Sequence, residues 1–235
     1  MSFWGNECIN AAILNNIGCK FLEHGAFREA FETFGDALDS YRESFLRTNL
    51  EGGGSQQQLR LEAAAARLRE VNLCKSSIVR IMELGDDDFV SLAAEPSFGK
   101  FILKGFRLSC RGSCVRDTDV DCAVMLYNFG LAHVLILQFG MRERKAFKDA
   151  SRLMRFSLGL FKKELSNRLR RGLAENNQEF RDMSSVTKVI ATNYSYIIAK
   201  RGREAEARQC YTEIEEFLEQ NPHHKEQLGT TAPAA

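Results

Sequence analysis

The chain has little proline, little tryptophan and no long apolar run, and each shortage narrows its class. It contains three prolines and one tryptophan in 235 residues, and scarce proline favours uninterrupted helices. Its first ten residues, MSFWGNECIN, lack a basic region followed by an apolar stretch, so we expect no secretory signal. The best apolar run, residues 131–138, is interrupted by His133 and is too short to span a bilayer. We therefore expect a protein without a membrane span, located in the cytoplasm or the nucleus.

The chain also lacks the cysteine spacing of a disulfide scaffold, and it has no large excess of positive or negative charge. The seven cysteines are an odd number scattered through apolar helical pattern, which predicts reduced thiols rather than disulfides. The net charge is +1, so global electrostatics favour no class of partner. With 44% hydrophobic and 27% charged residues, the chain can bury an ordinary core as one domain or one short repeat array.

Catalytic and metal-binding motifs are scarce. The GGGS at residues 52–55 lacks the lysine and the preceding strand of a nucleotide loop, and no GxSxG elbow occurs. The DTDVD at residues 117–121 lacks the glycine and glutamate of a calcium loop, and suits an acidic helix N-terminus better. Of Cys110, Cys114, Cys122 and His133, only the first two have zinc-ligand spacing. We therefore expect that the protein is not an enzyme and that it binds no cofactor and no metal.

Residues 14–37, LNNIGCKFLEHGAFREAFETFGDA, have the spacing of two antiparallel helices joined by a short turn at Gly25. Helices approach closely where small side chains face each other, and both predicted helices supply them. The positions concerned are Leu14, Ile17, Gly18 and Phe21, followed by Phe27, Ala30, Phe31, Phe34 and Ala37. A single hairpin leaves one apolar face uncovered, so we expect further copies along the chain.

This spacing resembles the tetratricopeptide repeat (TPR), whose pattern is W-x-x-L-G-x-x-Y, a turn, and A-x-x-x-F. The terminal proline of the repeat is absent, and Arg42 stands in its place. A degenerate second copy with a longer turn surrounds Gly130, and a third copy surrounds Ser195, with its turn at Gly202. The resemblance implies an all-α, TPR-like helical-hairpin solenoid of about three hairpins.

The remaining sequence predicts additions to this array. Residues 58–85 predict a long extra helix, because EAAAARLRE has high helix propensity and an apolar stripe continues to Ile81. Within a partly irregular insertion, FGKFILKGFRLS favours a possible short β segment. The predicted divisions are a first hairpin at 1–50, a Gly/Ser/Gln linker at 51–57, the long helix at 58–85, the insertion at 86–119, the second hairpin at 120–171, the third hairpin at 184–220 and a disordered tail at 221–235.

An asparagine stands two positions before the small residue of each copy, which helix packing does not require. These residues are Asn16, Asn128 and Asn193. The first helices of stacked TPR hairpins line the concave surface, so the three side chains are expected to form a row along a groove. An asparagine amide both donates and accepts, so it can pair with the N–H and C=O of an extended peptide of any sequence. The alternative is that asparagine is merely tolerated at a half-exposed helical site.

TPR superhelices of the kinesin light chain and O-linked N-acetylglucosamine transferase type are similar at this repeat position, where their asparagines form a ladder on bound peptide. The residues that follow the small positions here are Cys19, Leu131 and Tyr196, which do not provide the carboxylate clamp of chaperone-binding repeats. The resemblance implies a noncatalytic scaffold that binds an extended peptide segment of a partner protein. Weaker candidates for the wall of the groove are Lys20, Tyr127, His133 and Lys200.

An alternative function rests on a basic stretch at residues 141–171, which could bind RNA or another polyanion. Its first residues form the expected basic face, which consists of Arg142, Arg144, Lys145, Lys148, Arg152 and Arg155. The phenylalanines at positions 147, 156 and 161 fall at spacings consistent with core packing, so exposed aromatics for base stacking are not expected. The default interpretation of this stretch is a solvated helix face.

Overall fold

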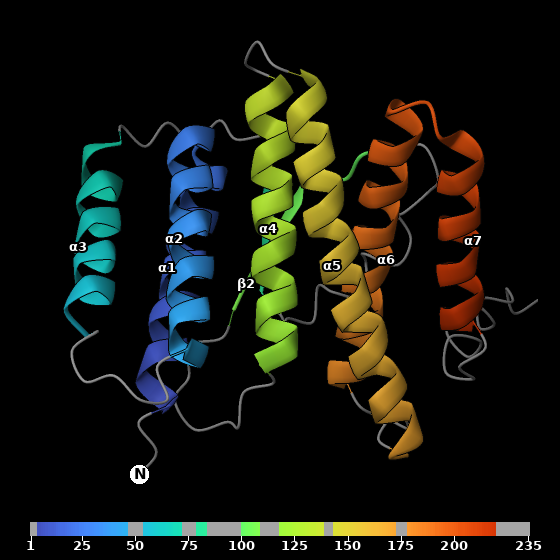
Figure 1. The fold of residues 1–235 in the computed structure, drawn as a ribbon, viewed down its shortest axis with the longest axis horizontal. Coiled ribbons are helices and arrows are strands. Elements are labelled where there is room, and N and C mark those ends of the chain that lie inside the picture. Colours follow the sequence, from blue (N-terminus) through green and yellow to red (C-terminus); the bar gives the residue numbers. More distant parts are fainter. Residues whose placement is uncertain are drawn as a thin grey trace, which may run out of the picture.

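The computed structural model describes residues 4–46, 54–71, 79–83, 100–108, 118–138, 143–172 and 178–219. This part of the chain is mostly helical, as expected, with seven helices and two short strands. Figure 1 labels the elements along the chain. The helices are α1 (Trp4–Glu23), α2 (Phe27–Leu46), α3 (Gly54–Glu70), α4 (Thr118–Gln138), α5 (Glu143–Arg170), α6 (Gln178–Lys200) and α7 (Glu204–Glu219), and the strands are β1 (Arg80–Glu83) and β2 (Lys104–Arg107).

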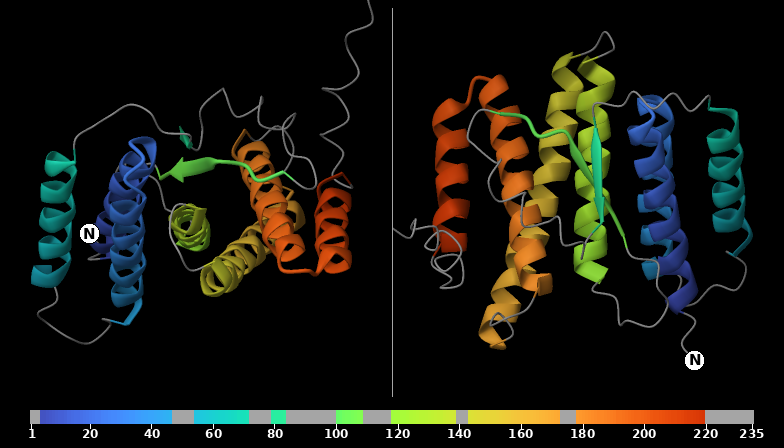
Figure 2. Two further views of the ribbon diagram at one scale, coloured as in Figure 1. Left: turned by 90° about the horizontal axis from the view of Figure 1, so that it is seen from above. Right: turned by 180° about the vertical axis from the view of Figure 1, so that it is seen from behind.

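Three helical hairpins, α1/α2, α4/α5 and α6/α7, lie side by side (Figure 1). Helix α2 packs on α4, and α5 packs on α6, so each hairpin covers the apolar face of the next. Helix α3 packs against α1 and α2 at one end of the row, and α7 lies at the other end. The extended residues that include β2 cross the row on one side, behind α4 in Figure 1 and in full view in Figure 2.

The first and third hairpins turn in the same way. Gly25 and Gly202 follow α1 and α6 with φ angles of 75° and 80°, a left-handed conformation that glycine adopts without steric cost. After Gly25, the Ala26 N–H donates to the Phe21 C=O at 2.9 Å, and the corresponding bond across Gly202 is 3.2 Å. This bond closes a Schellman cap, which satisfies carbonyl groups at the end of each first helix.

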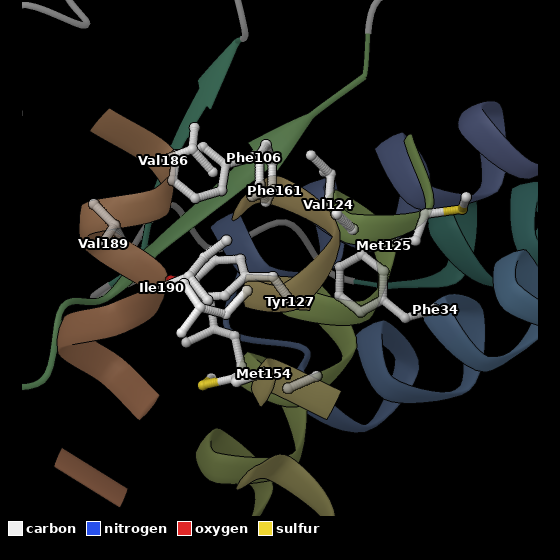
Figure 3. Packing of buried hydrophobic residues seen from close by; sticks show 14 of the residues in the cluster. Phe34, Phe106, Val124, Met125, Tyr127, Met154, Phe161, Val186, Val189 and Ile190 are labelled. Atoms are coloured by element: carbon white, nitrogen blue, oxygen red, sulfur yellow. The ribbon is translucent and has the colours of Figure 1, made fainter. Parts of the chain in front are cut away.

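The contact between α1 and α2 depends on a glycine. A Cβ atom at Gly18 would lie 2.6 Å from the ring of Phe34, so no other residue lets that ring approach so closely. Gly130 has a similar role on α4, where a Cβ would lie 3.1 Å from the Cγ of Met154. Figure 3 shows the core that results, in which buried side chains from α2, α4, α5, α6 and β2 converge.

The prediction of one helix over residues 58–85 is wrong. Helix α3 ends at Glu70, and residues 80–83 form β1, which pairs in parallel with β2, with Ile81 opposite Gly105; residues 72–78 lie outside the described residues. Ile and Val suit a strand as well as an apolar helical stripe, and the tertiary pairing with β2 decides between the two. Strand β2 itself lies in the predicted insertion, while residues 84–99, 109–117 and the tail from 220 lie outside the described residues.

Two helices begin earlier than the sequence predicts. Helix α3 starts at Gly54, inside the expected linker 51–57, because Gln57 is buried and donates to the Ser40 C=O at 3.3 Å. Helix α6 starts at Gln178 rather than at residue 184, since Phe180 and Met183 are buried in the core. Tertiary burial therefore extends both helices beyond their local sequence signals.

Within the described part of the chain, α4 alone is long and apolar enough to cross a membrane by length and composition. The apolar run at 131–138 is only part of this helix, which extends from Thr118 to Gln138. Most of α4 is buried, because it packs against α2, α5 and β2. Such burial is ordinary for a central core helix.

Candidate functional site

The three asparagines each bind the backbone of one residue in the chain's own segment 100–108, here called the internal segment. In every pair, the backbone N–H donates to Oδ1 of the asparagine and Nδ2 donates to the backbone C=O of the same residue. We call Asn16, Asn128 and Asn193 the asparagine ladder. The N···Oδ1 and Nδ2···O distances are 2.6 and 2.8 Å for Asn193 with Ile102, 3.0 and 2.7 Å for Asn128 with Phe106, and 2.8 and 2.7 Å for Asn16 with Leu108.

The ladder follows the two-residue period of an extended chain. The N–H and C=O of one residue in a strand point to one side, and those of the next residue point to the other. Residues 102, 106 and 108 face the ladder, and the intervening Lys104 C=O accepts a hydrogen bond from the Tyr127 hydroxyl at 2.8 Å. On the opposite edge, Arg80 N–H donates to the Leu103 C=O at 2.9 Å. Strand β1 thus pairs with one edge of the internal segment, and side chains of α1, α4 and α6 pair with the other.

The spacing of the ladder follows the spacing of the helices. Ile102 and Phe106 are four residues apart, or about 13 Å in an extended chain, whereas Phe106 and Leu108 are about 7 Å apart. Helices α1 and α4 contact each other directly, and α6 packs on α5. The shorter step, from Phe106 to Leu108, therefore joins the neighbouring helices α4 and α1. The segment runs from α6 toward α1, opposite to the chain order of the hairpins (Figure 2).

The centre of the ladder contains two polar groups that the sequence analysis missed. Asn15 Nδ2 donates to the Phe106 C=O at 3.2 Å, and the Cys19 thiol donates to the same oxygen at 3.4 Å. Asn128 Nδ2 also donates to Asn15 Oδ1 at 2.9 Å. Burial raises the pKa of the Cys19 thiol, so it stays protonated and remains a donor. Asn15 directly precedes a ladder residue, but a neighbouring position gives no signal of its own.

Apolar burial holds the same segment. The side chains of Ile102, Phe106 and Leu108 are 8%, 0% and 3% exposed. The ring of Phe106 lies 5.3 Å from that of Tyr127, and both side chains belong to the buried core (Figure 3). The Tyr127 hydroxyl accepts from Asn193 Nδ2 at 2.9 Å. Burial also raises the pKa of Tyr127, which keeps its hydroxyl a donor to the segment. The residues that face the ladder thus also bury their side chains.

The predicted wall residues lie in different places. Tyr127 lies beside the ladder and donates to the Lys104 C=O of the internal segment, and the exposed Lys200 places its ammonium 5.4 Å from the ring of Tyr196. That ring lies 5.3 Å from Phe101, at the start of the internal segment. Lys20 is exposed on α1. The structure therefore brings Tyr127 into the site and Lys200 to its margin.

His133 lies at another contact. Its ring is 4.7 Å from that of Phe31 on α2 and 4.8 Å from that of Phe129 on its own helix. Burial lowers the pKa of His133, and nearby Asp149 opposes this shift. We conclude that His133 packs between α2 and α4 rather than beside the internal segment.

The basic face is exposed where the structure describes it. Lys148, Arg152 and Arg155 are exposed on α5, while Arg142 and the side chains of Arg144 and Lys145 lie outside the described part. The expectation of core packing is wrong for Phe156, which is 67% exposed, and holds for Phe161, which is 0% exposed. The two phenylalanines are five residues apart, which places them on different faces of α5.

The structure describes only some of the residues that the sequence suggested as metal ligands. Among these residues, no group of three or more His, Cys, Asp or Glu side chains could hold a metal ion. Cys110 and Cys114 lie outside the described ranges. Asp119, at the start of α4, forms an ion pair with Lys163 at 2.8 Å.

We compared the chain with protein-family models, with curated proteins and with solved structures, and none of the three comparisons found a match. The function must therefore be inferred from the contacts themselves. The asparagine ladder is the feature with the most specific geometry in the described part of the chain.

Proposed function

We propose that this protein is a noncatalytic, TPR-like scaffold that binds an extended segment of a partner protein along α1, α4 and α6. The observation that carries the proposal is the asparagine ladder, in which three side-chain amides pair with both backbone groups of alternate residues. Such pairing depends on the backbone rather than on side chains, so it suits a site for peptides. The row of hairpins, and the glycine caps that the first and third of them share, support the TPR-like solenoid.

In this proposal the internal segment is an intramolecular ligand that the partner replaces. A tethered ligand has an effective concentration on the order of millimolar. The partner must compete with it, so occupancy by the internal segment lowers the apparent affinity for the partner. A partner that forms the same six backbone hydrogen bonds exchanges with the internal segment at little net cost in hydrogen bonding.

This competition dictates the design of the test. Replacing a ladder asparagine weakens the binding of both the partner and the internal segment. A change on the internal segment weakens the binding of the internal segment alone. Arg107 is suitable, because its guanidinium forms an ion pair with Glu23 at 2.6 Å and its side chain is outside the ladder. Arg28→Ala is the matched control, since it removes an exposed ion pair with Glu32 on α2.

The experiment captures partners from cell extract with the full chain, its Arg107→Ala and Arg28→Ala variants, and Arg107→Ala combined with Asn128→Ala. All four proteins are first compared for helicity by circular dichroism. We expect Arg107→Ala to raise the capture of specific partners severalfold, Arg28→Ala to leave it unchanged, and the added Asn128→Ala to abolish the gain. Identical partner lists from the four folded proteins would contradict the proposal.

A second candidate function is polyanion binding by α5. The exposed Phe156 favours it, because an aromatic ring beside Arg152 and Arg155 provides a stacking surface next to cations. This candidate predicts that affinity for single-stranded RNA falls steeply as salt rises, and that Arg152→Glu reduces both the affinity and the slope. A binding curve that is flat between low and moderate salt would exclude it.

A further inference from the structure

We propose that the ladder accepts extended segments in one register and one direction, with apolar residues at the first, fifth and seventh positions, glycine at the fourth and a basic residue at the sixth. This is the pattern of residues 102–108, and the inference rests on the proposed function. The ligand class is therefore a partner segment that copies the internal one, and side chains beside the ladder select it. Burial accounts for the apolar positions, a close approach for the glycine and an ion pair for the basic residue.

The ladder bonds alone do not fix the direction of the ligand. Each asparagine binds the N–H and C=O of a single residue, and rotating the side-chain amide by half a turn exchanges its donor and acceptor. A reversed chain could thus form the same bonds. If the segment is reversed while the same backbone groups still face the asparagines, however, the side chains of the bound residues point to the opposite face, because L-residues have fixed handedness.

Burial therefore determines the direction. The side chains of Ile102, Phe106 and Leu108 all belong to the buried core. A reversed segment would point these three side chains away from the core and lose their apolar burial. Apolar side chains at the first, fifth and seventh positions of the pattern are consequently required in one direction only.

Glycine is favoured at the fourth position by a close approach. A Cβ at Gly105 would lie 2.8 Å from Cδ1 of Ile81 and 3.5 Å from both Oδ1 of Asn128 and Cδ1 of Leu22. The end of the Ile81 side chain can rotate away, so alanine is tolerated at a modest cost. A β-branched side chain also meets the Asn128 amide and Leu22, and displaces the central pair of the ladder.

A basic residue is favoured at the sixth position by Glu23, the last residue of α1. The Arg107 guanidinium and the Glu23 carboxylate are 2.6 Å apart, and both side chains are about a quarter to a third exposed. Because both side chains are partly exposed, such an ion pair adds only modestly to affinity. Its greater effect is on selection, because an acidic residue at this position would face the Glu23 carboxylate.

The test uses a fluorescent peptide with the sequence of residues 100–108 and three altered peptides, which carry Gly105→Val, Arg107→Glu or the reversed order of residues. The host is the full chain with Arg107→Ala, which weakens the internal competitor and keeps Glu23. We expect the unaltered peptide to bind with at least about tenfold higher affinity than each altered one. The full chain with Glu23→Arg should show the opposite preference between the unaltered and Arg107→Glu peptides, because its internal Arg107 and the unaltered peptide are both repelled.

The outcomes separate this inference from the proposed function. If all four peptides bind equally, and Asn128→Ala in the host abolishes their binding, the ladder binds peptides but the selection proposed here is wrong. If no peptide binds to either folded host, the proposed function fails and this inference fails with it. Exchange of preference between the Arg107→Ala and Glu23→Arg hosts supports both, because a general loss of stability cannot invert selectivity.

Discussion

The side-chain amide of Asn128 forms two hydrogen bonds with a single residue, Phe106, and both residues are 0% exposed. The Phe106 N–H donates at 3.0 Å, and its C=O accepts at 2.7 Å. A buried backbone group without a partner is costly, so a side chain here performs the task that a neighbouring strand performs in a sheet. The internal segment is thereby paired on both edges without a second strand on the side of the helices.

Asn128→Ala is expected to destabilise the fold by about 1–3 kcal/mol, because it removes the acceptor of the buried Phe106 N–H. The Phe106 C=O keeps donors from Asn15 and Cys19, which limits the loss. The control is Asn16→Ala at the half-buried end of the ladder, where water can replace the lost partner and a smaller cost is expected. Urea unfolding measures both variants. Equal costs for the two would show that burial does not control the strength of the ladder.

Tyr127 should make stability decrease at alkaline pH. Burial raises the pKa of Tyr127 in the folded protein above its usual value of about 10, so the folded state holds this proton more tightly than the unfolded state. The contribution is fully present below pH of about 10 and declines as pH rises above that value. Tyr127→Phe lacks this proton, so the stability gap between wild type and variant should narrow from about pH 10 upward. Urea unfolding of both proteins over a pH series tests this, and a constant gap would contradict it.

Gly18→Ala is expected to destabilise the first hairpin by about 1–3 kcal/mol, because the new methyl group overlaps the ring of Phe34. Gly159→Ala on α5 is the matched control, since a Cβ there meets nothing within 4 Å. Alanine is the better helix former, so the control should gain about 0.5–1 kcal/mol. Thermal unfolding measures both. Partial recovery in Gly18→Ala combined with Phe34→Leu would identify the steric origin of the loss.

Phe156→Ala and Phe161→Ala should differ sharply although both lie on α5. Phe161 is fully buried, and its truncation is expected to cost about 3–5 kcal/mol. Phe156 is 67% exposed, so its truncation should change stability by less than about 0.5 kcal/mol. Similar losses in urea unfolding would mean that Phe156 is covered in solution.

The contacts and the turn of the first hairpin, α1/α2, could be predicted from the local sequence. Gly18, Ala30, Phe34 and Ala37 were predicted as contact positions, and the latter three are fully buried. Such contacts join residues close in sequence, and their spacing is set by the helical period, so both are visible in the sequence. For the same reason, the turn at Gly25 was predictable from glycine alone. The mostly helical class is likewise confirmed.

Helix faces and strand boundaries were less predictable. Phe156 has the spacing of a core residue but faces solvent, because the neighbouring helices decide which face of α5 is covered. Residues 80–83 continue an apolar pattern that suits a helix, yet they pair with β2. In both cases the deciding contacts come from residues distant in sequence.

The sequence by itself indicated the helical hairpins, because their contact positions follow the local period of a helix, and it showed three asparagines at one offset from the small residue of each copy. That these asparagines should bind an extended chain was a hypothesis based on the chemistry of the amide. Only the tertiary structure decided what lies against them, namely residues of the same chain. Asn16 and Leu108 are separated by 92 positions, and Asn193 and Ile102 by 91. Contacts over such separations depend on how the hairpins stack, which no local pattern encodes.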